Sequence, residues 1–482
     1  MITVGLDFGT HQTKICIEDK DGVECKYTFM KHMDANGKFQ YTLPSIINIC
    51  PDGKLQYGYI SHKPKGEIIR YFKQGAFRTI PYMKMTQEDA LYYSCWYLAY
   101  ILFDLEEKFG QNFAIQMGAP TDGGHYETAK QISVRILASA YRLVEDVFKN
   151  DKRAFLNTPI ANLKKLTVIE QYSISLKDNY GILVFPEAYA CLKPLTSKGK
   201  IADSIGLMVD IGGGTTDISL FTIAPNVEDV NMVSNGKDRK KERVPVVYDF
   251  HSIDMGLNFL TNALQKEKEN SIQSSIDNTE VRHKGILHTL GEIFSNHNNK
   301  TAQLSNEKIT SNVESDEEFD ISRKEQFTQE IRKYVSNIDN RIRAELKKFS
   351  SFTKKDIDEA LSNRPIIYCG GGSTFKTLRK NYFIFTDRRL ITHSDWDIKY
   401  VEDAGEIINL GLIPILSTAY GLAISVKNDN ITQKSFKNMF DYLREVDRDR
   451  KRQISGLDSQ ENSRKKHSYT SINDYDSYDA WK

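Results

Sequence analysis

The sequence is poor in features that mark secreted or membrane proteins. Its six cysteines lie far apart and include no Cys-x-x-Cys pair, so we expect mostly buried free thiols in a reducing compartment. The longest nearly continuous apolar run, residues 91–103, is shorter than the roughly 20 residues that span a bilayer. No basic and apolar leader precedes the first strand pattern. We therefore expect a cytoplasmic location and no membrane partner.

The sequence also lacks an excess of either charge. Its 65 Lys and Arg residues are matched by 64 Asp and Glu residues, which leaves a formal net charge of +1. No overall field directs such a chain to nucleic acid, so we expect no nucleic-acid partner. With 482 residues, 40% of them hydrophobic and 27% charged, the chain has the composition of a globular protein and room for two or more domains.

A glycine-rich turn in the middle of the chain carries the first functional signal. Residues 207–221 read as an apolar strand, a turn at Gly212, Gly213 and Gly214, and an alternating strand. Glycines have no Cβ, so this backbone can adopt positive φ and approach a ligand, and its N–H groups can form a nest for phosphate oxygens. Asp210 and Asp217 flank the turn with carboxylates that suit Mg²⁺. Taken alone, the stretch fits an ordinary glycine-rich hairpin equally well.

Two further motifs favour the ligand-binding interpretation. Residues 2–17 repeat the same order, with an apolar strand, Asp7, Gly9, Thr10 and a second alternating strand. Residues 365–374 form another apolar strand that runs into glycines. Three widely spaced turns of this kind suggest a nucleotide held between two related halves.

With these motifs the chain resembles the actin/Hsp70 ATPase superfamily, and most closely the nucleotide-binding domain of Hsp70-type chaperones. The resemblance covers roughly residues 1–428, with gaps. In family order, the matching segments are a first phosphate loop at 7–14, a first connecting helix at 185–190, a second phosphate loop at 210–217, an adenosine loop at 370–374 and a second connecting helix at 414–423.

The resemblance implies an α/β fold of the actin-like ATPase type, with two RNase H-like lobes around a central nucleotide cleft. Each lobe would carry a smaller peripheral subdomain. Lobe I would span residues 1–200 with its subdomain near 41–109, and lobe II would span 201–428 with a helical subdomain near 257–363. Residues 429–482 would form a short amphipathic helix and a disordered tail.

Hydrophobic periodicity predicts several elements independently. Apolar positions at helical spacing indicate helices over 87–109, about 124–150 and 323–349, and a strand precedes the second of these at 113–120. The very polar region 265–325 predicts partly disordered insertions near 267–282 and 298–320.

By resemblance, the site would bind ATP or ADP with Mg²⁺ and hydrolyse ATP. Asp7 and Asp210 would hold the hydrated ion, and Glu187 would orient the attacking water, with Asp217 as a second candidate for that task. Two lysines are candidates for the cation at the γ-phosphate. Lys73 matches the Hsp70 arrangement and Lys14 the actin arrangement; the alternatives are a solvated lysine and a strand-edge lysine.

The nucleotide itself would be held mainly by backbone groups and glycine loops. The predicted residues are Gly9, Thr10, His11 and Gln12 in the first loop, Gly212, Gly213, Gly214, Thr215 and Thr216 in the second, and Gly371, Gly372, Ser373 and Phe375 on the adenosine side. Two of these depart from the Hsp70 pattern. His11 stands where Hsp70s usually have Thr, and we expect only its backbone to contribute. Phe375 replaces an Arg that stacks on the base, so an aromatic ring could stack there, or the base could sit differently.

What the ATPase would drive is a separate question. A complete Hsp70 continues into a peptide-binding domain, whereas here only about 50 polar residues follow the resemblance. We expect a nucleotide-driven switch or reduced chaperone that binds a protein partner through the insertions or the tail, where Tyr469, Tyr475, Tyr478 and Trp481 are candidates for docking. The alternatives are an actin-like filament protein of the bacterial cytoskeletal or plasmid-segregating kind and, more weakly, a sugar or acetate kinase.

Overall fold

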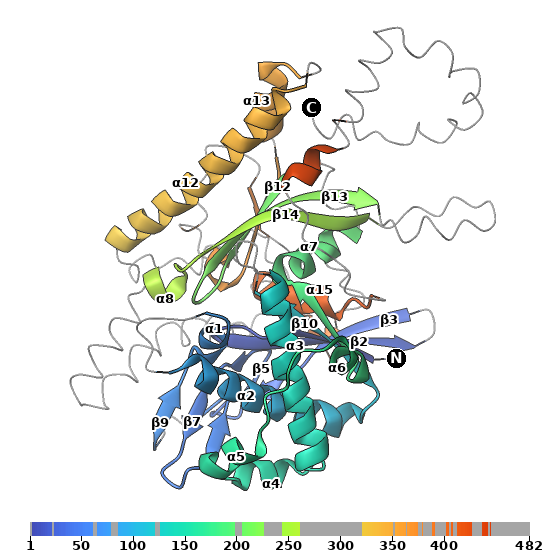
Figure 1. Cartoon of the computed structure of the whole chain (residues 1–482), viewed down its shortest axis with the longest axis vertical. Coiled ribbons are helices and arrows are strands. Elements are labelled where there is room, and N and C mark those ends of the chain that lie inside the picture. The colour runs from blue at the N-terminus through green and yellow to red at the C-terminus, as the bar shows by residue number, and fades with distance from the viewer. Residues whose placement is uncertain are drawn as a thin grey trace, which may run out of the picture.

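The computed structural model describes residues 2–21, 24–60, 65–78, 85–120, 126–197, 205–225, 243–260, 321–349, 352–362, 364–374, 378, 388–390, 402–403, 406–407, 412–426, 436–441 and 444. These residues form a mixed α/β protein with two main sheets, one above the other, and helices between and outside them (Figure 1). The predicted insertions at 267–282 and 298–320, the tail from 447 and Phe375 lie outside the described residues.

The first main sheet has the strand order β3-β2-β1-β10-β11. Its antiparallel strands β1, β2 and β3 form a meander, and β10 and β11 run parallel to β1. The strands are β1 (Ile2–Asp7), β2 (Gln12–Asp21), β3 (Glu24–Phe29), β10 (Phe113–Ala119) and β11 (Ile182–Pro186), with the short β6 (Leu43–Pro44) also paired to β2.

The second main sheet repeats this topology. Its order is β14-β13-β12-β15-β16, with an antiparallel meander of β12, β13 and β14 and with β15 and β16 parallel to β12. The strands are β12 (Gly206–Ile211), β13 (Thr216–Pro225), β14 (Arg243–Ile253), β15 (Ile366–Cys369) and β16 (Arg388–Leu390). Both sheets therefore have the same strand order and the same strand directions.

Amphipathic helices cover the outer faces of both sheets. The helix α2 (Gln87–Phe109) begins where Thr86 accepts a hydrogen bond from the Asp89 N–H, and it shares one hydrophobic core with β1, β10 and α3 (Tyr126–Arg142). On the second sheet, α12 (Ile321–Leu346) and α13 (Lys354–Ser362) form the corresponding core. The predicted helices at 87–109 and 323–349 are confirmed. The helix predicted over 124–150 ends earlier, because its last turn widens into the π-helix η1 (Leu143–Val147).

The remaining elements are short. One is a three-stranded sheet of β7 (Ile47–Ile49), β8 (Leu55–Tyr57) and β9 (Glu67–Ile69). Two are strand pairs, β4 (His32–Met33) with β5 (Phe39–Gln40) and β17 (Glu402–Asp403) with β18 (Glu406–Ile407). The short helices are α1 (Phe72–Phe77), α4 (Lys152–Asn157), α5 (Ile160–Leu166), α6 (Ile174–Asn179), α8 (Leu257–Leu260), η4 (Gly371–Thr374) and η8 (Phe436–Phe440). Within the predicted amphipathic stretch after residue 429, η8 places Met439 and Phe440 in the second core.

Two helices form the layer between the sheets (Figure 1). The helix α7 (Glu187–Ser197) follows the first sheet but packs on β14 of the second, whereas α15 (Ile413–Ala423) packs on β1 and β2 of the first. The two helices cross closely, since a Cβ on Gly421 would lie only 1.7 Å from the Ala190 carbonyl oxygen. Every residue of α15 is buried, which agrees with its continuous apolar sequence.

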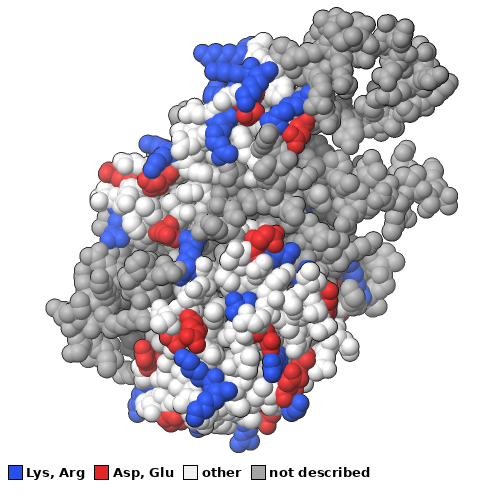
Figure 2. All heavy atoms as spheres, viewed as in Figure 1, with Lys and Arg blue, Asp and Glu red and all other residues white. Residues whose placement is uncertain are grey.

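Side chains outside the cores give an ordinary mixed surface. Lys, Arg, Asp and Glu are mixed over the described part of the face in Figure 2, and one group of basic residues lies near the junction of α12 and α13. None of the helices in the described ranges is long and apolar enough to cross a membrane. All six cysteines are free, and Cys16, Cys95, Cys191 and Cys369 are buried, which confirms the prediction of mostly buried thiols.

Candidate functional site

A cleft lies where strands of both sheets end. The parallel strand β1 ends at Asp7, and Pro120 and Glu187 directly follow β10 and β11. The parallel strands β12 and β15 end near Asp210 and Gly370, and all five residues line the cleft. The carboxyl ends of parallel strands meet at one edge of a sheet, and this edge is where α/β proteins bind ligands. The cleft encloses about 1130 Å³ of empty space, part of it open to solvent.

The loop between β1 and β2 directs N–H groups toward this cleft. Its carbonyl groups are held from behind, because the Ser45 hydroxyl donates to the Gly9 oxygen at 2.7 Å and the Ser45 N–H to the His11 oxygen at 2.8 Å. No described residue accepts from the N–H groups of Thr10 and His11. The turn requires glycine at position 9, where a Cβ would lie 2.2 Å from the Gln12 oxygen.

The loop between β12 and β13 is built in the same way. The first residues of α8 hold its carbonyl groups, since the Leu257 N–H donates to the Gly212 oxygen at 3.1 Å and the Asn258 N–H to the Gly213 oxygen at 2.9 Å. Among the described residues, nothing accepts from the N–H groups of Gly213 and Gly214. Two loops whose N–H groups have no acceptor among the described residues therefore line one cleft, an arrangement that suits an anion.

The glycines of this second loop serve a different purpose from the predicted one. None of Gly212, Gly213 and Gly214 adopts positive φ. They are needed because the loop is crowded by the opposite side of the cleft. A Cβ on Gly213 would lie 2.5 Å from the His11 ring, and one on Gly214 would lie 3.0 Å from the Gln74 amide oxygen.

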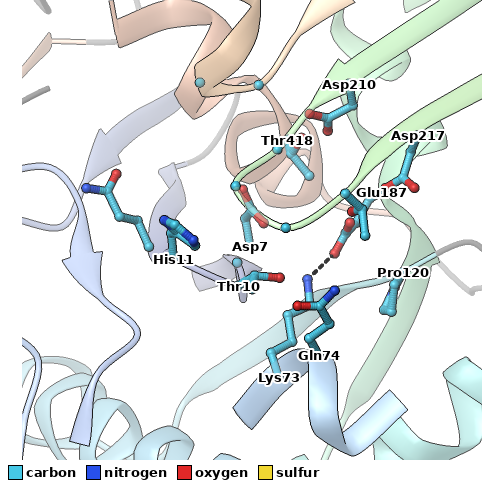
Figure 3. Close-up of a pocket in the computed structure, with 18 of the residues that line it drawn as sticks. Asp7, Thr10, His11, Lys73, Gln74, Pro120, Glu187, Asp210, Asp217 and Thr418 are labelled. Carbon is cyan, nitrogen blue, oxygen red and sulfur yellow. Dashed lines mark hydrogen bonds and ion pairs between the residues drawn. The ribbon is translucent and has the colours of Figure 1, made fainter. Parts of the chain in front are cut away.

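Four carboxylates line the cleft, namely Asp7, Glu187, Asp210 and Asp217 (Figure 3). Burial raises the pKa of Asp210 to about 6, and the charges of Glu187 and Asp7 add to this effect. Burial raises the pKa of Asp217 to about 7, with further contributions from Asp210 and Glu187 against an opposing hydrogen bond from Ser252. The Asp217 Oδ1 is buried and has no hydrogen-bond partner among the described residues. The site therefore holds more negative charge than its own residues neutralise.

These carboxylates suit a hydrated cation better than a fully protein-bound one. No group of three or more His, Cys, Asp or Glu side chains in the described part of the chain is arranged to hold a metal ion. Asp7 and Asp210 nevertheless share the cleft, and the charge of Asp7 affects the pKa of Asp210. Mg²⁺ keeps several waters and takes one or two carboxylates together with phosphate oxygens, so this donor set fits Mg²⁺.

Two lysines enter the cleft, and each binds a carboxylate. The Lys14 Nζ donates to Asp7 at 2.9 Å. The Lys73 Nζ donates to Glu187 at 2.8 Å, the contact drawn as a dashed line in Figure 3. Burial opposes the charge of Lys14, but the Asp7 carboxylate outweighs it and the pKa of Lys14 is raised. Lys73 is only 6% exposed, with its Nζ 5.8 Å from the centre of the Phe8 ring. Lys73 is thus not a solvated surface lysine.

The loop after β15 closes the far side of the cleft. Gly370 has φ +80°, and a Cβ there would lie 2.1 Å from Asp210 Oδ1, so both conformation and space require glycine. Gly371 lines the cleft, but Gly372 packs on Ile211 and Ser373 donates its hydroxyl hydrogen to the Gly370 oxygen at 2.7 Å. These last two residues shape the loop and do not line the cleft.

Several cleft residues were not predicted from the sequence. They include Gln74, Arg78, Pro120 and Thr418. Arg78 pairs with Asp254 and donates to the Ser252 hydroxyl at 2.6 Å, so it joins the end of α1 to the second half across the cleft. In the sequence, Arg78 is marked only by its position five residues after Lys73. Pro120 is marked only by its position at the end of a predicted strand. His11 also contributes a side chain, where only its backbone was expected.

Most of the predicted site is brought together in this one cleft. It is lined by Asp7, Gly9, Thr10, His11, Gln12, Lys14, Lys73, Glu187, Asp210, Gly212, Gly213, Gly214, Thr215, Asp217 and Gly371. Thr216 does not line the cleft, and its hydroxyl donates to the Met255 oxygen at 2.8 Å. In comparisons with known proteins, no protein-family model matches this chain, and no curated protein matches it significantly.

Proposed function

We propose that this protein is a cytoplasmic Mg²⁺-dependent ATPase with the actin-like fold, used as an Hsp70-like nucleotide-driven switch or reduced chaperone. One observation carries the proposal. Two loops at equivalent positions of two sheets offer unpaired N–H groups to one cleft that also contains four carboxylates and two lysines. Phosphoryl transfer requires positioning and charge neutralisation more than covalent chemistry by the protein, and this set of groups supplies both.

The architecture supports the actin-like assignment. Both sheets have an antiparallel meander of three strands followed by two parallel strands, and the cleft lies between them. The helices α7 and α15 each pack on the sheet of the other half, as expected for connecting helices of that fold. The order of the loops along the chain is the order that the sequence motifs predict.

The phosphates would bind between the two loops. The N–H groups of Thr10, His11, Gly213 and Gly214 would donate to phosphate oxygens from opposite sides. Asp7 and Asp210 would hold Mg²⁺, which when bound would offset the charge of the phosphates. Lys14 and Lys73 would add positive charge; each is kept in place by its carboxylate partner.

Glu187 and Asp217 are the candidates for handling the water. Glu187 accepts a hydrogen bond from Lys73, so its carboxylate is already oriented at the cleft. The pKa of Asp217, near 7, suits a group that accepts a proton at neutral pH. We assign the orientation of water to Glu187, with Asp217 as the alternative, and expect Glu187→Gln to lower kcat by about 100-fold while changing ATP affinity far less.

The decisive experiment is ATP hydrolysis by the purified chain with and without Mg²⁺. We expect turnover that requires Mg²⁺ and stops on chelation. Absence of both ATP binding and turnover would refute the proposal. Sedimentation of the same samples separates a switch, which stays in solution, from an actin-like filament, which pellets above a critical concentration. A protein partner would be sought with the full chain, because the predicted binding segments lie outside the described residues.

A further inference from the structure

The His11 side chain lies between the two phosphate-binding loops. It extends from the first loop, and its ring is so close to the second that a Cβ on Gly213 would be 2.5 Å away. The Tyr71 ring lies next to the imidazole, with the ring centres 5.6 Å apart and the ring planes at 50°. Figure 3 shows His11 beside Thr10 at the edge of the cleft, and the cleft is lined by both residues.

One nitrogen of this ring lacks a hydrogen-bond partner of normal geometry among the described residues, although the Asn258 amide lies near enough to raise the pKa of the imidazole. The His11 Nε2 is buried, and no described residue forms a hydrogen bond with it. Buried polar atoms are normally paired, and an unpaired one next to a binding site points to a missing ligand. Thr10, Gly213 and Gly214 line the same cleft as His11, and no described residue accepts from the N–H groups of these four residues, so they are further candidate donors to an anion bound there.

Two positive charges, Arg70 and Lys14, disfavour the imidazolium form of His11, although four carboxylates line the same cleft. The pKa of His11 is lowered to about 4, mainly by burial and also by the charges of Arg70 and Lys14, against an interaction with the Asn258 amide that raises it. Tyr71 and Gly213, which pack against the ring, carry no charge at neutral pH. A bound phosphate would reverse this balance, because its negative charge favours the imidazolium form.

We propose that His11 Nε2 donates a hydrogen bond to a phosphate oxygen of the bound nucleotide, and that nucleotide binding is accompanied by uptake of a proton from solvent onto His11. The inference rests on the proposed function, since it assigns an additional phosphate ligand to the same site. Because the His11 ring lies against both loops, occupancy of the phosphate site would affect both loops through His11.

The test is calorimetric titration of Mg²⁺–ADP into the full chain at pH 6, in PIPES and in imidazole buffer. These buffers differ in ionisation enthalpy, so the difference in heat counts the protons taken up. We expect the wild type to take up at least about 0.5 proton per nucleotide more than His11→Gln, which retains a donor but does not titrate. We also expect the affinity of the wild type to increase more as the pH falls, by up to about tenfold per unit.

A direct measurement complements the calorimetry. The imidazole of His11 can be titrated by NMR in the wild type with and without Mg²⁺–ADP, and its signal assigned by its absence from His11→Gln or His11→Thr. We expect a titration midpoint that moves upward when nucleotide is bound. Equal proton uptake in wild type and His11→Gln, or an unmoved midpoint, would overturn the inference while leaving the ATPase proposal intact. Failure of the wild type to bind nucleotide would instead refute the ATPase proposal and this inference with it.

Discussion

The hairpins β1–β2 and β12–β13 occupy equivalent places in the two halves but differ in charge, because the first carries an ion pair and the second carries two carboxylates. In the first, Asp7 is the cross-strand partner of Lys14, and their side chains form an ion pair of 2.9 Å. In the second, Asp210 is the cross-strand partner of Asp217. The same register therefore places a cation beside one carboxylate and a second carboxylate beside the other.

This difference indicates how a repeated fold produces an asymmetric site. In the first hairpin the Lys14 charge neutralises the Asp7 charge, so this hairpin could lie close to a phosphate without a bound cation. The second hairpin concentrates negative charge, and burial together with neighbouring carboxylates raises the pKa of both its aspartates. The second half is thus where a bound cation would have the largest effect. The experiments below change one hairpin at a time.

The largest effect is expected from Asp210→Asn, which removes one of the two carboxylate charges of the second hairpin. If Asp210 holds Mg²⁺, kcat for ATP should fall by about 100- to 1000-fold, the range found when a group that stabilises the transition state is removed. Turnover measured at saturating Mg²⁺ gives the result. The matched control is Asp52→Asn, an aspartate in the first half that is 57% exposed. A loss of less than about tenfold would contradict the assignment.

A pH experiment on Asp217→Asn would measure the cost of burying the Asp217 carboxylate in the second hairpin, to which the charges of Asp210 and Glu187 also contribute. The pKa of Asp217 rises from 3.8 to about 7 on folding, so the folded state binds this proton more tightly. The free energy of unfolding of the wild type, without metal or nucleotide, should therefore lose this contribution as the pH rises from about 4 to about 7. The variant should become progressively more stable than the wild type over that window, by at most about 1.4 kcal/mol per pH unit. Urea unfolding of both proteins at several pH values would measure it, and parallel pH profiles would exclude it.

The first hairpin should respond in the opposite sense. Lys14→Met leaves the buried Asp7 without its cation, and we expect a loss of about 3 kcal/mol in the free energy of unfolding. Adding Asp7→Asn should recover most of that loss, because the uncompensated charge is then gone. Chemical unfolding of the two single variants and the double variant completes the cycle. Additive effects of the two substitutions would mean that the pair is not coupled.

The smallest effect is expected for Arg78→Ala, which removes a contact between the halves without altering either hairpin. Its partner Asp254 is 69% exposed, and such exposed ion pairs contribute between 0 and about 1 kcal/mol. ATP affinity should therefore fall by no more than about fivefold, with kcat nearly unchanged. Equilibrium binding compared with Asp254→Asn would show whether both variants act through the same contact. A loss of 100-fold or more would mean that Arg78 contacts the nucleotide directly.

Strand-to-glycine motifs allowed much of the site to be predicted. Asp7, Asp210 and Glu187 each directly end or follow an apolar strand pattern, and parallel strands deliver such residues to one edge. The long helix at 87–109 was equally clear, because its pattern begins with the acidic residues Glu88 and Asp89 in the first turn and continues for 23 residues.

What the sequence did not reveal depends on contacts between distant segments. The crowding of Gly213 by His11 joins loops some 200 residues apart, so local glycine patterns suggested positive φ where the true cause is a close approach. Arg78 acquires its role only from Ser252 and Asp254 in the other half. The equivalent register of Lys14 and Asp217 likewise becomes visible only when both hairpins are aligned in space.

The close crossing at Gly421 and Ala190 has a consequence for how the protein can be divided. Each half contributes the helix that shields the inner face of its counterpart, so a cut between residues 197 and 205 would leave both fragments with an uncovered apolar surface. Neither fragment should fold by itself, and mixing the two should restore structure only as a complementing pair. We expect any opening of the molecule to be a rotation of the two halves about this contact. Direct separation of the halves would expose the apolar inner faces of both sheets at the same time.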